Sequence, residues 1–476
     1  MDEKQFVKEI ADIDENFTQW YTDVVLKTEL VDYGPVKGTM VIRPYGYAIW
    51  ENIQKDMDRR FKETGAQNAY FPLLIPMSFF TKEQEHVEGF APEVAVVTHA
   101  GGAKLEEPLA IRPTSETIIG TMYSKWIQSY RDLPVIMNQW CNVMRWEKTT
   151  RPFLRTSEFL WQEGHTVHAT EEEAMEETMR MLDVYKSFAE ETLAIPVICG
   201  RKTEKEKFAG AVATFGMEAM MLDGKSLQAG TSHYLGQNFA KAFDIKYLDK
   251  DGSLKYGYTT SWGTSTRMIG AIIMAHGDKR GLVLPPKVAP YQVVIVPVAA
   301  HKGGVNEKSQ ELMQSLVAAD VRVKLDLRDM SPGRKFNDWE MKGVPVRVEV
   351  GPRDLENGVA VVMRRDTLEK FTVRLDELVG YVKRLLGEIQ KDMLENSRKR
   401  RDAKIIEADS LDGILSGVEG KNFVKAGWCG CRECEDKVKE YAQATARVMA
   451  DEEGIPERCA VCGKPAKHKV IFARAY

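Results

Sequence analysis

Residues 135–168 read VIMNQWCNVMRWEKTTRPFLRTSEFLWQEGHTVH, and this pattern predicts a β-hairpin. Two strand-like runs, at residues 135–146 and 156–168, are rich in β-branched and aromatic residues and flank a basic loop. Arg145 stands near the end of the first run, and Arg155 stands just before the second. The hairpin therefore places guanidinium groups beside an apolar sheet face.

Around this hairpin, strand-like segments and amphipathic helical segments are mixed. We predict helices at residues 5–30, 48–64 and 170–192, and strands near residues 68–76, 229–235, 246–247 and 256–261. This mixture indicates helices packed on a largely antiparallel sheet over residues 1–285.

A change of composition at Leu284-Pro-Pro-Lys-Val-Ala-Pro290 is typical of a linker. Beyond it, strands alternate with helices, which favours a compact α/β domain, and a long polar helix then leads to a cysteine-rich tail. With 476 residues and about 150 residues per domain, three domains are expected. We predict an α+β fold with domains at residues 1–285, 286–388 and 389–476.

The composition is that of an ordinary globular enzyme, with 43% hydrophobic residues. The strongest apolar run, residues 293–300, is far below the roughly 18 residues that a bilayer-spanning helix needs, so we expect no membrane span and a cytoplasmic protein. The net charge of −4 argues against nonspecific coating of nucleic acid. The basic run at residues 391–404 is either a local patch or a solvated helix surface.

Two arginines far apart in the chain suggest the chemistry. Arg145 lies in the hairpin, and Arg267 lies where a run of small residues turns into an apolar segment. Guanidinium groups stay charged and bind phosphate or carboxylate in a bidentate manner, so two of them can meet on one anionic substrate. Arg145 and Glu147 alternate on one predicted strand and would face the same side, where they could equally form a surface salt bridge.

Two further segments carry candidate ligand-binding groups. Thr114 and Glu116, in Ile111-Arg-Pro-Thr-Ser-Glu-Thr117, could hold a substrate ammonium. The alternative is a helix N-cap, with Thr114 or Ser115 capping a helix from Thr117 onward. His233 lies in the polar, glycine-bearing stretch 228–238, which suits a site close to backbone, but a buried turn histidine is the alternative. Neither a dinucleotide-binding fingerprint nor a Walker motif is present in the sequence.

The tail contains two cysteine clusters that suit a structural zinc ion with four thiolate ligands. They consist of Cys429, Cys431 and Cys434 and of Cys459 and Cys462. Five thiols compete for four places: spacing favours Cys431 with Cys434 as the first pair, and Cys429 with Cys434 is the rival. A redox pair is the alternative to a metal site.

Together these segments resemble the class II aminoacyl-tRNA synthetases, and in detail the prolyl-tRNA synthetases of the archaeal and eukaryotic type. Gly65-Ala-Gln-Asn-Ala-Tyr-Phe-Pro-Leu-Leu is similar to the first family motif, with Pro72 at the dimer interface. The stretch from Arg145 to Phe159 resembles the second motif, and Gly263 to Gly270 resembles the third. Arg112-Pro-Thr-Ser-Glu resembles the loop that receives the imino group of proline.

The resemblance implies roles for individual residues. Arg145 and Arg267 would be catalytic. The proline-binding residues would be Thr114, Glu116, Arg145, Trp161, Glu163, His165, Phe208 and His233. The ATP-binding residues would be Arg145, Glu147, Arg155, Thr156, Phe159, Gln228, Thr231, Ser265 and Arg267. The zinc ligands by family spacing would be Cys429, Cys434, Cys459 and Cys462. Glu340, Arg347 and Glu349 would meet the anticodon, or else form ion pairs on a strand surface.

The implied activity is the ATP-dependent ligation of L-proline to tRNA(Pro) through a prolyl-adenylate, with Mg²⁺ at the catalytic site, Zn²⁺ in the tail and a homodimeric assembly. Another class II synthetase, or a noncatalytic tRNA-binding paralogue, is the alternative. The short interval between Glu163 and Ser261 leaves no space for the editing insertion of many bacterial relatives.

Overall fold

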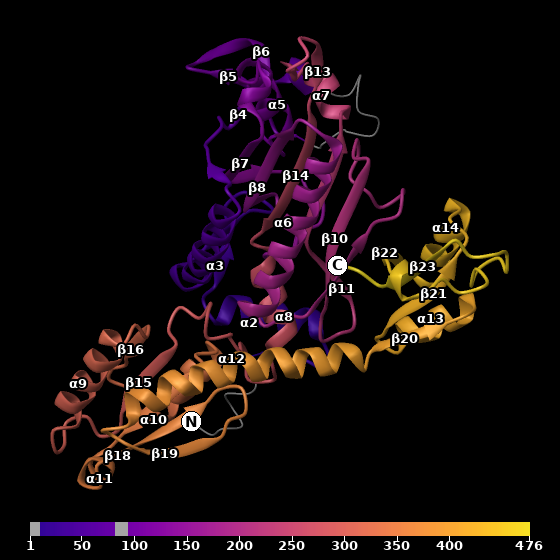
Figure 1. Cartoon of the computed structure of the whole chain (residues 1–476). Helices are drawn as coiled ribbons and strands as arrows, with labels where there is room; N and C mark the ends of the chain where they lie inside the picture. The colour runs from indigo at the N-terminus through magenta and orange to yellow at the C-terminus, as the bar shows by residue number, and fades with distance from the viewer. Residues whose placement is uncertain (1–9, 81–93) are drawn as a thin grey trace.

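The computed structural model describes residues 10–80 and 94–476 of the chain. Three bodies, each with a sheet of its own, follow one another along the chain (Figure 1). We call them the N-terminal domain (to residue 285), the middle domain (residues 286–388) and the C-terminal domain (residues 389–476). Helix α12 (Leu378–Asp402) passes from the middle domain to the C-terminal domain and crosses residue 388 without a break.

The predicted hairpin forms two neighbouring strands of the largest sheet. Strand β7 (Val135–Met144) pairs antiparallel with β8 (Glu158–His168) along its whole length. Within the described residues this sheet has seven strands in the order β3-β7-β8-β14-β11-β10-β9. The others are β3 (Gln67–Asn68), β14 (Tyr258–Ser265), β11 (Ser226–Gly236), β10 (Ala213–Met220) and β9 (Val197–Arg201). Only β3 with β7 is parallel, so the predicted antiparallel sheet is confirmed.

Helices that pack on the core of this sheet include α3 (Pro44–Glu63), α6 (Glu171–Glu191) and α8 (Arg267–His276). Helix α6 begins near the predicted residue because Thr170 caps it, accepting a hydrogen bond from the Glu173 amide. In the core, the Trp262 ring of β14 lies 5.0 Å from the Phe61 ring of α3. Gly164 on β8 makes this packing possible, because a β-carbon there would lie 2.1 Å from the Trp262 ring.

Some expectations for this domain are wrong. Residues 5–9 of the helix predicted at 5–30 lie outside the described residues, and the described part is helical only as α2 (Phe17–Lys27), since Asn16 caps it. The strand predicted near 68–76 is two short strands in separate sheets, β3 and β4 (Leu74–Pro76). The hairpin of β5 (Val96–Ala100) and β6 (Ala103–Ile111) escapes the pattern because β6 contains charged residues and a proline.

The remaining elements of the N-terminal domain are short. They are β1 (Val31–Tyr33), β2 (Met40–Ile42), β12 (Lys246–Leu248), β13 (Leu254–Tyr256), α5 (Glu116–Trp126), α7 (Asn238–Phe243) and the 3-10 turn η2 (Tyr130–Asp132).

The middle domain, described throughout, has a five-stranded sheet in the order β16-β15-β17-β18-β19. Its strands are β15 (Val293–Pro297), β16 (Val323–Leu325), β17 (Val346–Val350), β18 (Val359–Arg364) and β19 (Lys370–Arg374). Its helices are α9 (Val305–Ala318), α10 (Pro332–Met341), α11 (Pro352–Glu356) and α12. The predicted α/β alternation is confirmed. Strands β15 and β17 are both buried along their whole length, and β15 reads as a continuous apolar run, whereas β17 carries Arg347 and Glu349.

The C-terminal domain is a four-stranded sheet in the order β20-β21-β23-β22 with two helices, also described throughout. Its elements are β20 (Ile405–Ala408), α13 (Leu411–Glu419), β21 (Phe423–Trp428), α14 (Arg432–Ala442), β22 (Thr445–Met449), the turn η3 (Asp451–Glu453) and β23 (His468–Ala473). Strand β22 packs against β9 and β10 of the large sheet, and the chain end returns to β11 (Figure 1).

The basic run at residues 391–404 is part of α12. Arg398 pairs with Glu190 at 3.1 Å, and Arg400 donates a 2.7 Å hydrogen bond to the Ala275 carbonyl oxygen. These two guanidinium groups therefore hold α12 against the N-terminal domain. None of the described helices has both the length and the apolarity that crossing a bilayer requires.

Candidate functional site

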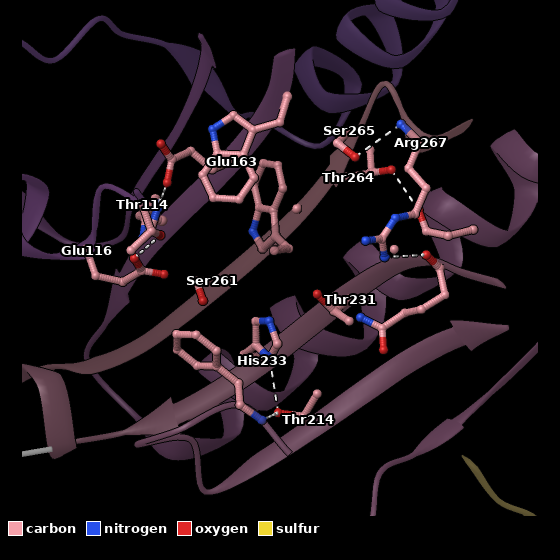
Figure 2. Close-up of a pocket in the computed structure, with 18 of the residues that line it drawn as sticks. Thr114, Glu116, Glu163, Thr214, Thr231, His233, Ser261, Thr264, Ser265 and Arg267 are labelled. Atoms are coloured by element: carbon pink, nitrogen blue, oxygen red, sulfur yellow. Dashed lines mark hydrogen bonds and ion pairs between the residues drawn. The ribbon is translucent and has the colours of Figure 1, made fainter. Parts of the chain in front are cut away.

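A cavity of about 340 Å³ lies over strands β8, β14 and β11 and gathers most of the predicted site residues (Figure 2). The predicted residues in its lining are Thr114, Glu116, Arg145, Phe159, Trp161, Glu163, His165, Phe208, Gln228, Thr231, His233, Ser265 and Arg267. In Figure 2, Thr114, Glu116 and Glu163 lie at one end and Ser265 and Arg267 at the other.

Glu163 organises the acidic end of the cavity. Its buried carboxylate accepts hydrogen bonds from Ser115 Oγ and from Gln139 Nε2 at 3.1 Å, and it pairs with His165 Nε2 at 2.8 Å. Burial alone would raise the pKa of Glu163, but the bonds from His165, Ser115 and Gln139 outweigh burial and lower it. The hydrogen bond and the negative charge of Glu163 in turn raise the pKa of His165 despite its burial. The pair is thus held as an ion pair.

The loop at Thr114 and Glu116 does not cap its helix through a side chain. Ser115 occupies the N-cap position of α5, but its hydroxyl donates to Glu163 instead. Thr114 Oγ1 donates to the carboxylate of Glu116, which is buried at the first position of α5. The helix-cap interpretation is therefore wrong for these side chains, and both line the cavity.

Arg145 lies directly after the last residue of β7, not within the strand as predicted. Its Nε donates to the Pro113 carbonyl oxygen at 3.0 Å, which fixes the direction of the guanidinium group. That group lies over the Phe159 and Trp161 rings, with 5.6 and 5.4 Å to their centroids. Burial lowers the pKa of Arg145, against the opposing charges of Glu116, Glu163 and Glu147.

Arg267 is the first residue of α8. Its Nε donates to the Leu154 carbonyl oxygen at 3.1 Å, and its backbone N–H donates to Ser265 Oγ at 3.2 Å. Burial lowers the pKa of Arg267, and the nearby charges of Arg155 and Arg145 lower it further. Two guanidinium groups close enough to repel each other favour an anion between them. The structure thus brings Arg145 and Arg267 to one cavity.

His233 faces the cavity from β11. Its Nδ1 lies 3.0 Å from Thr214 Oγ1, and its ring centroid lies 4.7 Å from that of Phe208. Burial, with a smaller effect of His165, lowers the pKa of His233 to about 3. His233 is therefore neutral at physiological pH and forms a flat, largely apolar surface with Phe208.

Three residues predicted to contact ATP are not in the cavity lining. Arg155 pairs with Glu147 at 3.4 Å on the exposed side of the hairpin loop. Thr156 is buried, and its hydroxyl donates to the Glu158 carbonyl oxygen at 2.8 Å. Glu147, Arg155 and Thr156 all lie in the loop that joins β7 to β8.

Other lining residues carry polar groups that the predicted set does not contain. They include Glu206, Thr214, Ser261 and Thr264. The hydroxyl oxygen of Ser261 is buried and has no hydrogen-bond partner among the described residues, so it is available to a ligand. The alternation of Ser261 with Gly263 and Ser265 on β14 is the one sequence signal that indicates a shared face.

The cysteine cluster is a second candidate site. The sulfur atoms of Cys429, Cys434, Cys459 and Cys462 all lie within 4.8 Å of one another. Cys431 Sγ lies 3.3 Å from Cys429 Sγ but does not belong to this group. Four converging thiols from two chain segments have the donor chemistry of a tetrahedral zinc site, and the observed group matches the family-implied set.

The residues predicted at the anticodon bind one another. Arg347 is buried and pairs with Glu349 at 2.8 Å and with Glu340 at 2.7 Å. Its guanidinium carbon also lies 4.1 Å from the centroid of the Phe336 ring. These contacts form a buried ion-pair network between α10 and β17, rather than ion pairs on an exposed strand surface.

Comparison with known proteins identifies the class of this architecture. The model of the tRNA synthetase class II core domain (G, H, P, S and T) matches residues 99–276, and that of the anticodon binding domain matches residues 292–385. An antiparallel sheet with converging arginines and a separate α/β domain thus defines a class II aminoacyl-tRNA synthetase. The prolyl-tRNA synthetase C-terminal model matches residues 411–476.

Whole-chain comparisons are more specific. Proline--tRNA ligase of Alkaliphilus oremlandii is 61% identical over 477 residues, covering 100% of this chain and 99% of the relative. Proline--tRNA ligase 2 of Clostridioides difficile is 58% identical with the same coverage. The crystal structure of prolyl-tRNA synthetase from Cryptosporidium parvum complexed with halofuginone and AMPPNP has a TM-score of 0.94 at 42% identity and covers 98% of this chain and 99% of its own. The chain belongs to the prolyl-tRNA synthetase family.

Proposed function

We propose that this chain joins L-proline to tRNA(Pro), with ATP consumed to form a prolyl-adenylate. The observation that supports this best is the convergence of Arg145, Arg267 and Glu116 on one cavity of a class II synthetase sheet. Two cations suit the α-phosphate and the substrate carboxylate, and one carboxylate suits the secondary ammonium of proline.

The proline would lie at the end formed by Glu116, Thr114, His233 and Phe208. Its ammonium would donate to Glu116 and Thr114, and its ring would rest on the apolar surface of His233 and Phe208. The ion pair of Glu163 with His165, and the ring of Trp161, would hold this end in shape.

The nucleotide would lie toward Arg267, with Phe159 against adenine and with Gln228, Thr231 and Ser265 along its length. Glu147, Arg155 and Thr156 would meet the part of ATP that extends beyond the cavity. The charge of Arg155 lowers the pKa of Arg267, which accords with both cations serving the same nucleotide.

The chemistry of the first step follows from charge. A carboxylate is already ionised at neutral pH, so its attack on the α-phosphorus needs no general base. Arg145, held by Pro113, would align the carboxylate, and Arg145 and Arg267 would stabilise the growing negative charge. Mg²⁺, when bound, neutralises phosphate charge; Gln228 offers it a hard oxygen donor in the cavity lining.

The four-thiol cluster would hold Zn²⁺ as a structural ion, with Cys429, Cys434, Cys459 and Cys462 as ligands. We further propose a homodimer that uses the surface around Pro72, where the apolar side chains of Tyr70 and Leu74 are 73% and 42% exposed. Glu340, Arg347 and Glu349 remain proposed anticodon contacts, and a cytoplasmic location remains a prediction.

We also propose that the chain does not edit misacylated tRNA itself. The interval between β8 and β14 consists of α6, β9, β10, β11, α7, β12 and β13, which belong to the N-terminal domain. A pocket for proline rejects smaller alanine weakly, so correction would occur in trans. Rapid deacylation of alanyl-tRNA(Pro) by the purified enzyme would contradict this.

The experiment that tests the function is ATP–pyrophosphate exchange with each amino acid in turn. Exchange that depends on proline alone supports the proposal. Exchange with threonine or glycine would favour another class II synthetase, and no exchange with any amino acid would favour a noncatalytic tRNA-binding paralogue.

A further inference from the structure

The segment at residues 202–208 forms one side of the cavity and lies between strands β9 and β10. Its residues Glu206, Lys207 and Phe208 line the cavity. The Phe208 amide donates to Thr214 Oγ1 at 3.0 Å, and the same hydroxyl contacts His233 Nδ1. The conformation of this segment therefore determines the shape of the end that we assign to proline.

Helix α14 of the C-terminal domain holds this segment. Thr203 Oγ1 donates a 2.9 Å hydrogen bond to Glu435 Oε1, and Lys205 Nζ pairs with Asp436 Oδ1 at 2.5 Å. Thr203 and Glu435 are 1% and 2% exposed, whereas the Asp436 side chain is 43% exposed. Exposed ion pairs contribute little, so the buried bond between Thr203 and Glu435 is the stronger of the two contacts.

The Thr203 hydroxyl connects Glu435 to the cavity lining. It also accepts a 3.3 Å hydrogen bond from the Glu206 amide, and the Glu206 and Lys207 amides both donate to the Thr203 carbonyl oxygen. A shift of Glu435 would therefore be passed through one side chain to the first lining residue. The site of Glu435 is itself well fixed, because it follows the buried Cys434 of the four-thiol cluster.

We propose that Glu435 is a positioning residue for the amino acid substrate, and that the C-terminal domain shapes the proline end of the cavity through Thr203. This inference rests on the proposed function for the identity of the substrate. Neither Glu435 nor Thr203 lines the cavity, so both act through the 202–208 segment.

The decisive variant is Thr203→Val in the full-length enzyme, because it removes the hydroxyl and leaves the C-terminal domain unaltered. Its KM for proline in pyrophosphate exchange should rise about tenfold, the size expected from losing one buried hydrogen bond to a charged group, while its KM for ATP stays unchanged. Amide hydrogen exchange of residues 202–211 should become faster in the absence of substrates.

Two variants of Glu435 complete the test. Glu435→Leu should reproduce the rise in the KM for proline, whereas Glu435→Gln keeps an oxygen that accepts from Thr203 and should restore the value of the wild type. Tyr441→Phe is the matched control, because Tyr441 lies on the same helix and its hydroxyl bonds Asp412 within the C-terminal domain. Zinc content should be equal in all four proteins.

An unchanged KM for proline and unchanged exchange at residues 202–211 in Thr203→Val would overturn the proposal. Equal increases in KM for proline and for ATP would also overturn it, since they would indicate general destabilisation. If the wild type shows no proline-dependent exchange, the proposed function fails, and hydrogen exchange alone still decides whether Thr203 and Glu435 hold the segment.

Discussion

Arg447 of the C-terminal domain donates to both carboxylate oxygens of Glu218 in the large sheet, at 3.0 and 3.1 Å. Lys202 also pairs with this buried carboxylate. Burial alone would raise the pKa of Glu218, but the charges of Lys202 and Arg447 outweigh it and lower the pKa. One carboxylate thus joins β10 to β22 and to the start of the 202–208 segment.

Replacing Glu218 by Gln should destabilise the protein strongly. The change leaves the cations of Lys202 and Arg447 buried beside a neutral group, and removing one partner of such a pair costs about 3–5 kcal/mol. Urea unfolding of the full-length chain would measure this. The exposed side chain of Arg59, which pairs with Asp56 and Glu63, provides a control, since Arg59→Ala should change stability by less than about 1 kcal/mol. Equal effects of the two substitutions would contradict the prediction.

Acid should lower the stability of the folded protein, partly through protonation of Glu218. Its folded pKa lies below the ordinary value of 4.5, so its contribution is complete above pH 4.5 and is lost as pH falls through the folded pKa. Unfolding midpoints measured between pH 6 and pH 3 should fall more steeply for the wild type than for Glu218→Gln. Parallel curves would exclude Glu218 as a source of acid sensitivity.

The pKa values of the two histidines of the cavity should be shifted in opposite directions. His165 is paired with Glu163, which raises its pKa above 6.5 despite burial, whereas burial lowers the pKa of His233 to about 3. The stabilisation from His165 is complete below pH 6.5 and is lost as pH rises through its folded pKa. Imidazole NMR would resolve both. In Glu163→Gln the pKa of His165 should fall below 6.5, because burial remains; no fall would contradict the assignment.

Arg145→Ala should lower proline-dependent pyrophosphate exchange by at least about a hundredfold, since it removes a preorganised donor from the reacting carboxylate and phosphate. The fold should persist, because the side chain of Arg145 makes one hydrogen bond to backbone and rests on two rings. Far-UV circular dichroism checks this. Arg131→Ala, at the exposed turn η2, should exchange at the normal rate. Near-normal exchange in Arg145→Ala would remove Arg145 from catalysis.

Zinc analysis should separate the competing cysteines. Cys431→Ser should retain one zinc per chain, whereas Cys459→Ser should lose it, because only the latter belongs to the group of four sulfurs within 4.8 Å. Atomic absorption on the purified variants measures the content. Loss of zinc from Cys431→Ser would reverse the assignment of Cys429 and Cys431.

The hairpin at residues 135–168 and the buried strands of the middle domain were predictable from sequence, because period and composition are local properties that the chain carries with it. It was equally predictable that the charged side chains of Arg145 and Arg267 could bind phosphate. The strands β6 and β10 were not, since β6 contains charged residues and a proline, and β10 contains a glycine and a glutamate among its apolar residues.

The amino-acid sequence by itself determined which chemical groups are present: two guanidinium groups, a loop suited to bind the imino group of proline, and five thiols. Only the tertiary structure decided which of them meet. It placed Cys429 and not Cys431 among the four converging sulfurs, directed the Ser115 hydroxyl to Glu163 instead of to the end of its own helix, and set Glu435 against Thr203. The physical reason is that residue type and spacing encode what a side chain can do, whereas the direction of each side chain depends on packing between segments that are distant along the chain.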